Sequence, residues 1–227
     1  MLFRSEETVS TRVIAAVLFV SIASSVVVAQ TGKIEPIGPV TNSDVPAAVK
    51  KALETKGYRV SLDDGSVACE IWLRNKIPAQ PKKESPGALY TQLAESALVG
   101  VISFPQATTD YRGQNIRKGT YTLRYELIPN DGNHLGVAPN RDFVLLVPAA
   151  SDESPDATFK FDELVGLSRK ATGTKHPGPL SLVQPESGTA AAVSKDDEDL
   201  WIFSAAIKLA SGEDLPIALV VKGTAPQ

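Results

Sequence analysis

The chain has 227 residues, a formal net charge of −3 and 43% hydrophobic residues. Weak charge of mixed sign gives no electrostatic footprint for nucleic acid, so nucleic acid is excluded as an expected partner. The only cysteine is Cys69, which excludes an intramolecular disulfide, so stability must come from the burial of apolar side chains.

The first 29 residues match the pattern of a secretory signal peptide. Arg4 and Arg12 flank a polar start, residues 13–28 form a nearly unbroken apolar run, and Ala29 stands directly before Gln30. An uncleaved membrane anchor is the alternative, although the run is shorter than the roughly 20 residues that span a bilayer. The sequence therefore predicts an exported protein, periplasmic or extracellular, with no membrane span after signal cleavage.

The remaining chain predicts one domain of short strands. Residues 30–42 show little pattern and predict a linker, and residues 43–227 predict a single domain. Helices are expected over 45–56 and 161–168, and strands over 58–62, 66–73, 97–104, 121–127, 141–147, 180–184, 200–209 and 217–221. Short strands between Gly, Pro, Asn and Asp turns favour an antiparallel β-sandwich, immunoglobulin-like or jelly-roll-like, with one or two short helices.

The clearest strand pattern is the alternation over residues 121–127. Its apolar positions, which we expect in the core, are Tyr121, Leu123, Tyr125 and Leu127. Its polar positions, which we expect to face water, are Thr122, Arg124 and Glu126.

The densest polar cluster lies between two predicted strands. It comprises the runs Asn130-Asp131-Gly132-Asn133-His134 and Asn140-Arg141-Asp142. Asn, Asp and Gly are the residues of tight turns, so a purely structural turn is one interpretation. The alternative is a metal or hydrolase site, for which the candidates are Asp131, His134 and Asp142, with His176 arriving from elsewhere.

Other chemistry has little support in the sequence. The chain contains no Gly-x-Ser-x-Gly elbow, no phosphate loop and no dinucleotide fingerprint, so no cofactor is predicted. Cys69 lies in an alternating strand and is expected to be a core thiol. Trp72 and Trp201 are candidates for a sugar-binding platform, but their strand positions favour core packing.

One extended block of sequence carries a resemblance. It comprises Asp110-Tyr111-Arg112-Gly113-Gln114, Gly119-Thr120-Tyr121-Thr122-Leu123-Arg124-Tyr125, Pro129 to His134, and Arg141-Asp142-Phe143, together with the tract Glu70-Ile71-Trp72-Leu73-Arg74 and the final strands. The block resembles a group of uncharacterised exported bacterial proteins, which implies an exported β-sandwich and no particular activity.

Taken together, the sequence predicts an exported, non-catalytic β-sandwich that binds an unknown protein, glycan or envelope component. This expectation follows from the lack of any motif that combines an acid, a base and a nucleophile. The metal-binding or hydrolase use of the Asp131, His134 and Asp142 region stays open as the alternative.

Overall fold

The computed structural model describes residues 32–129, 138–186 and 188–225. Its helices are α1 (Ala47–Ala52) and α2 (Phe161–Thr172), with the 3₁₀ turn η1 (Ala149–Ser151). Its strands are β1 (Lys33–Ile37), β2 (Gly57–Ser61), β3 (Val67–Leu73), β4 (Leu98–Phe104), β5 (Thr108–Thr109), β6 (Asn115–Ile116), β7 (Gly119–Leu127), β8 (Asp142–Pro148), β9 (Pro179–Val183), β10 (Ala192–Lys195), β11 (Trp201–Lys208) and β12 (Asp214–Lys222). The predicted mainly β, antiparallel sandwich is confirmed.

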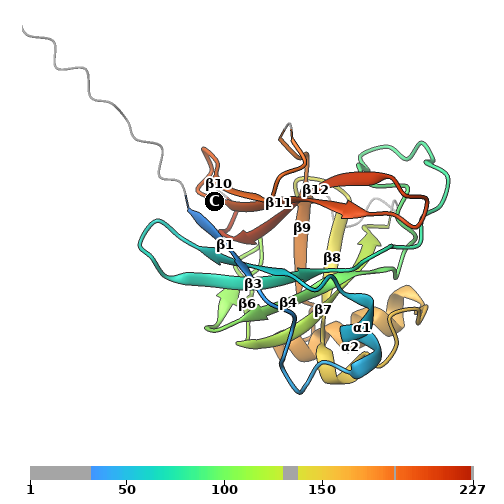
Figure 1. The fold of residues 1–227 in the computed structure, drawn as a ribbon, viewed down its shortest axis with the longest axis horizontal. Coiled ribbons are helices and arrows are strands. Elements are labelled where there is room, and N and C mark those ends of the chain that lie inside the picture. Colours follow the sequence, from blue (N-terminus) through green and yellow to red (C-terminus); the bar gives the residue numbers. More distant parts are fainter. Residues whose placement is uncertain (1–31, 130–137, 187, 226–227) are drawn as a thin grey trace, which may run out of the picture.

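Ten of these strands form one antiparallel sheet that curls on itself. Its order is β1-β2-β3-β4-β7-β8-β9-β12-β11-β10, and the short β5–β6 hairpin stands apart. In Figure 1, β10, β11 and β12 form one layer and β3, β4 and β7 the opposite layer, while β8 and β9 connect the two. The end strands β1 and β10 lie beside each other, so the sheet is almost closed into a barrel.

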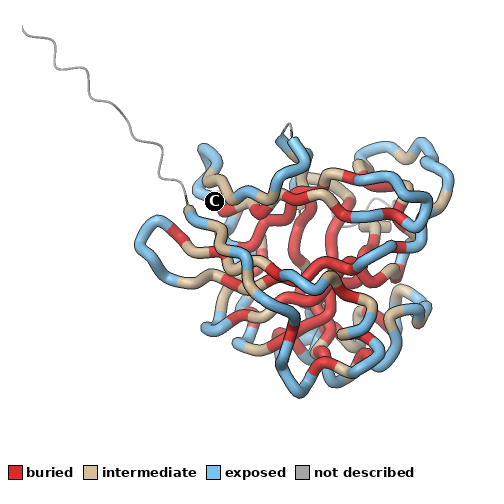
Figure 2. Tube along the Cα trace, in the orientation of Figure 1, coloured by how far each residue is buried: buried red, intermediate tan, exposed pale blue. Residues whose placement is uncertain are grey.

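The main core fills the space between the two layers. Inward-facing side chains of β3, β7 and β11, such as Ile71, Leu123 and Phe203, are at most 1% exposed. Figure 2 shows this buried interior as a continuous block surrounded by exposed turns. Cys69, Trp72 and Trp201 are all buried, which confirms the core placement expected for these side chains.

Both helices cover the outer face of the sheet. Val49 of α1 packs with Trp72 and Val101 of β3 and β4, whereas Leu164 of α2 packs with Leu145 of β8. The inner strands are therefore buried on both faces, which hides their period-2 pattern. In the described part of the chain no helix is long and apolar enough to cross a membrane.

Both helices differ in length from their predictions. α1 is shorter, because Leu53 already has extended backbone with ψ 161° and its N–H bonds back to the carbonyl of Lys50. α2 is longer and ends where Gly173 adopts a left-handed φ of 71°, which glycine reaches without strain.

The predicted linker over residues 30–42 is corrected by the structure. It contains β1, which pairs with β2 in the register Ile34↔Val60, and Ile34 packs against the main core. Pro36 in this strand and the glycines around it mask the strand pattern, but proline is tolerated on the end strand of a sheet. β10 was missed as well, because its stretch of small residues carries no clear alternation.

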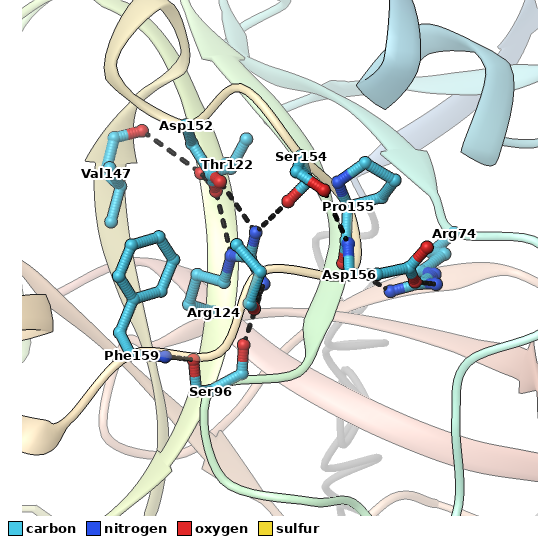
Figure 3. A network of polar contacts seen from close by, with 11 residues as sticks. Arg74, Ser96, Thr122, Arg124, Val147, Asp152, Ser154, Pro155, Asp156 and Phe159 are labelled. Carbon is cyan, nitrogen blue, oxygen red and sulfur yellow. Dashed lines mark hydrogen bonds and ion pairs between the residues drawn. The ribbon is translucent and has the colours of Figure 1, made fainter.

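The predicted exposure of the polar face of β7 is wrong. Thr122 and Arg124 are fully buried and Glu126 is 1% exposed, whereas Leu127 is only half-buried. The reason is that residues 152–159, between η1 and α2, cross the outer face of β7 and exclude water from it (Figure 3).

Arg124 is the centre of the network under this crossing segment. Its Nε and Nη2 donate to the two carboxylate oxygens of Asp152 at 2.8 and 2.6 Å. Its remaining donors bond the carbonyl oxygens of Ser96, Ala157 and Ser154 at 2.7–2.9 Å. All five N–H donors of the guanidinium thus have an acceptor, which is the condition for burying such a charge.

Candidate functional site

The four sequence-predicted site residues do not all fall in the described part of the chain. Asp131 and His134 lie outside the described residues. Asp142 is fully buried at the start of β8, and His176 is exposed in the turn between α2 and β9.

Asp142 has a structural role in this arrangement. Its Oδ1 accepts hydrogen bonds from the Tyr90 N–H at 3.0 Å and the Tyr125 hydroxyl at 2.7 Å, and its Oδ2 accepts one from the Leu89 N–H at 2.6 Å. The carboxylate therefore ties the long β3–β4 connection to β7 and β8. A metal ion at Asp142 would have to displace these three donors.

His176 belongs to a pocket on the outer side of β8 and β9, with a volume of about 400 Å³. Four stretches line it: the β5–β6 hairpin loop, the described residues before and after the β7–β8 connection, the start of α2, and the turn that leads into β9. The lining residues are Asp110, Tyr111, Arg112, Gly113, Gln114, Ile128, Pro129, Ala138, Phe143, Phe161, His176, Pro177, Pro179 and Ser181. The volume lies within the range of natural small-molecule sites.

One wall of the pocket is a tight loop built around Asp110. The Asp110 Oδ1 accepts the N–H groups of Arg112 and Gln114 at 3.0 and 2.8 Å, and its Oδ2 accepts the Gln114 side-chain amide at 3.1 Å. Gly113 has φ 78°, a left-handed turn position that favours glycine. Burial raises the pKa of Asp110, while these hydrogen bonds act in the opposite direction.

The Gln114 side chain fastens this loop to the turn before β9. Its Nε2 also donates to the Pro177 carbonyl at 2.6 Å, and its Oε1 accepts the Thr174 hydroxyl at 3.1 Å. The Thr172 hydroxyl in turn donates to the His176 carbonyl at 2.7 Å. Hydrogen bonds therefore hold the backbone on both sides of the pocket before any ligand arrives.

A second part of the lining is apolar. Phe143 and Phe161 come from β8 and the start of α2, while Pro177 and Pro179 flank the entry to β9. Phe143 belongs to the outer apolar cluster that packs α2 on the sheet, and Phe161 packs against it. The pocket therefore combines an apolar wall with a polar wall, which is the usual composition of a small-molecule site.

The comparisons with known proteins add no assignment. No protein-family model, curated protein or solved structure matches this chain. Within residues 32–129, 138–186 and 188–225, no group of three or more His, Cys, Asp or Glu side chains is placed to hold a metal ion. The functional conclusion therefore rests on the geometry of the pocket.

Sequence reasoning named His176 but missed the rest of this pocket. The available signal was local: Asp110 and Gln114 stand four residues apart around Gly113, a spacing typical of a side-chain-capped loop. Nothing local, however, indicates that this loop faces residues near position 177.

Proposed function

We propose that this protein is an exported, non-catalytic binding protein whose small-molecule ligand occupies the pocket between the Asp110–Gln114 loop and β9. The observation that carries the proposal is the pocket itself, with an apolar wall and a polar wall whose backbone is fixed by hydrogen bonds. Such preorganisation lowers the entropy cost of binding a ligand.

Binding is favoured over catalysis by the hydrogen bonding of His176, Asp110 and Asp142, the titratable side chains considered for catalysis. Among the residues that the structure describes, His176 forms hydrogen bonds only through its main-chain N–H and carbonyl, and a general base needs a side-chain partner to fix its tautomer. The carboxylates of Asp110 and Asp142 are occupied by structural donors. This arrangement supports a site that holds a molecule without transforming it.

The export part of the proposal is supported by the sequence of residues 1–29. The arginine-flanked apolar run that ends at Ala29 predicts cleavage before Gln30. Intact-mass analysis of the protein recovered from the envelope or medium tests this. A species that retains residues 1–29 would contradict cleavage and favour a membrane anchor.

The binding part is tested with phenylnaphthylamine, an uncharged apolar fluorophore, on the protein from residue 30 onward. Ala138 lines the pocket, whereas Ala47 is exposed on α1 and does not. We expect saturable binding of one probe, lost in Ala138→Trp because the indole fills the pocket, and kept in the matched control Ala47→Trp. Absence of binding, or equal binding by both variants, would overturn the proposal.

A further inference from the structure

We infer that the pocket selects anions: small molecules with an aromatic or aliphatic body and one carboxylate or sulfonate group. The inference rests on the proposed function and adds the chemical class of the ligand. It follows from which polar atoms of the lining are already bonded and which are left for a ligand.

The carboxylate and amide acceptors of the lining side chains are already used. Both oxygens of Asp110 accept hydrogen bonds from Arg112 and Gln114, and the Gln114 side-chain carbonyl accepts one from Thr174. A cationic or donor-rich ligand would have to compete with these bonds, and each broken bond would leave a donor unsatisfied.

Several side-chain donors of the lining, in contrast, are left for a ligand, and Arg112 among them can only donate. In the described part of the chain, the Arg112 guanidinium, the Tyr111 and Ser181 hydroxyls and the His176 ring make no hydrogen bond or ion pair. A group with several acceptor oxygens can use them together, and an arginine binds a carboxylate or sulfonate through two parallel hydrogen bonds.

The nearby acidic residues do not cancel this preference. Burial, and after it the charges of Glu198 and Asp196 before β11, raise the pKa of the Tyr111 hydroxyl. The Asp196 Oδ1, however, accepts the N–H groups of Glu198 and Leu200 at 3.0 and 2.9 Å, and Glu198 is exposed to solvent. Neither residue lines the pocket; the carboxylate that does, Asp110, already accepts the N–H groups of Arg112 and Gln114 and the Gln114 side-chain amide, whereas the Arg112 guanidinium has no such partner in the described part of the chain.

The body of the ligand is defined by the apolar wall. Phe143, Phe161 and the two prolines offer flat apolar surfaces and no hydrogen-bond donor side chains. They suit an aromatic ring or a short aliphatic chain, whose burial supplies affinity while the anionic group supplies orientation. A sugar without a charged group would leave the arginine unpaired and place hydroxyls against this wall.

Two fluorescent probes with the same ring system test the inference. Anilinonaphthalene sulfonate carries the anionic group, and phenylnaphthylamine lacks it. We expect the sulfonate to bind about tenfold more tightly or better, the scale of one charge-assisted interaction. Arg112→Gln should remove this advantage, so that the two probes bind with similar affinity, while the exposed α2 control Arg169→Gln should keep the tenfold difference.

The outcomes separate the inference from the proposed function. If both probes bind equally, Arg112→Gln has no effect and Ala138→Trp abolishes binding, the anion preference is overturned and the pocket stands as a binding site. If Ala138→Trp leaves both affinities unchanged, the proposed function fails and the inference fails with it. Near-ultraviolet circular dichroism of each variant verifies that the probes report a folded protein, since the sulfonate also binds loosened cores.

Discussion

Removing the guanidinium of Arg124 should destabilise the fold more than any surface substitution. The side chain is fully buried, and its five donors serve the Asp152 carboxylate and three main-chain carbonyls (Figure 3). In Arg124→Met, Asp152 would keep only the Thr122 hydroxyl, 2.6 Å away, as a side-chain donor. A buried, uncompensated carboxylate and three carbonyls without donors would remain under the 152–159 segment.

The expected loss is about 3–5 kcal/mol, the range for breaking a buried ion pair by removing one partner. Because small domains have unfolding free energies of roughly 5–15 kcal/mol, this is a large share of the total. Replacing both partners, in Arg124→Met with Asp152→Leu, should cost about 1–3 kcal/mol less than the sum of the single variants, because the orphaned charge is gone.

Urea denaturation followed by tryptophan fluorescence measures these differences. The matched control is Arg59→Met, which removes a similar two-bond contact to Glu70 at 2.9 and 2.7 Å, but from a side chain that is 43% exposed. It should cost about 0–1 kcal/mol, because solvent screens an exposed pair. A loss for Arg124→Met no larger than that of Arg59→Met would refute the argument.

Four further outcomes follow from buried side chains. Leu123→Ala, inside the barrel, should cost about 2–5 kcal/mol in urea denaturation. Burial raises the pKa of the Tyr90 hydroxyl to about 12. Its contribution to the free energy of unfolding is therefore complete below the ordinary pKa of 10.0 and is lost as the pH rises to 12. Phenolate absorbance and the variant Tyr90→Phe check this. Burial, and after it the charge of Glu95, raises the pKa of Glu126 from 4.5 to about 7. The wild type should therefore lose stability as the pH rises from 4.5 to 7, and Glu126→Gln should not show this loss. Cys69 is fully buried and its pKa is raised by burial, so a thiol reagent should label it only in urea; labelling of the native protein would show that the core opens.

The β7 strand shows how far sequence alone predicts this fold. Its alternation places Tyr121, Leu123 and Tyr125 correctly in the core, because period-2 patterning reports one face of a strand directly. The polar face was assigned to water because Arg124 is usually a surface residue. Its partner Asp152 lies beyond a further strand, and no local pattern connects the two residues.

The pocket could not be predicted for the same reason. Its walls come from residues near positions 110, 143 and 177, and only the pairing of β9 with β8 and the packing of α2 on the sheet bring them together. The sequence singled out His176 as one of two histidines, a composition argument that says nothing about its neighbours. Arg112 carries no sequence signal that separates it from any other loop arginine.

The strand order also constrains the order in which the strands of the barrel can pair during folding. From β1 to β9, each strand of the large sheet pairs with the preceding strand of that sheet, so the sheet can extend in chain order, although the β3–β4 and β8–β9 connections are long. The connection to the second layer is different: β12 pairs with β9 only through Ala218↔Val183 and Leu219↔Leu182, and β10 and β11 follow outward from it. A chain that emerges with its N-terminus first thus leaves the inner face of β7 and β8 uncovered until β12 has emerged. β12, the last strand of the sheet to be synthesised, is therefore the strand whose pairing with β9 joins the two layers.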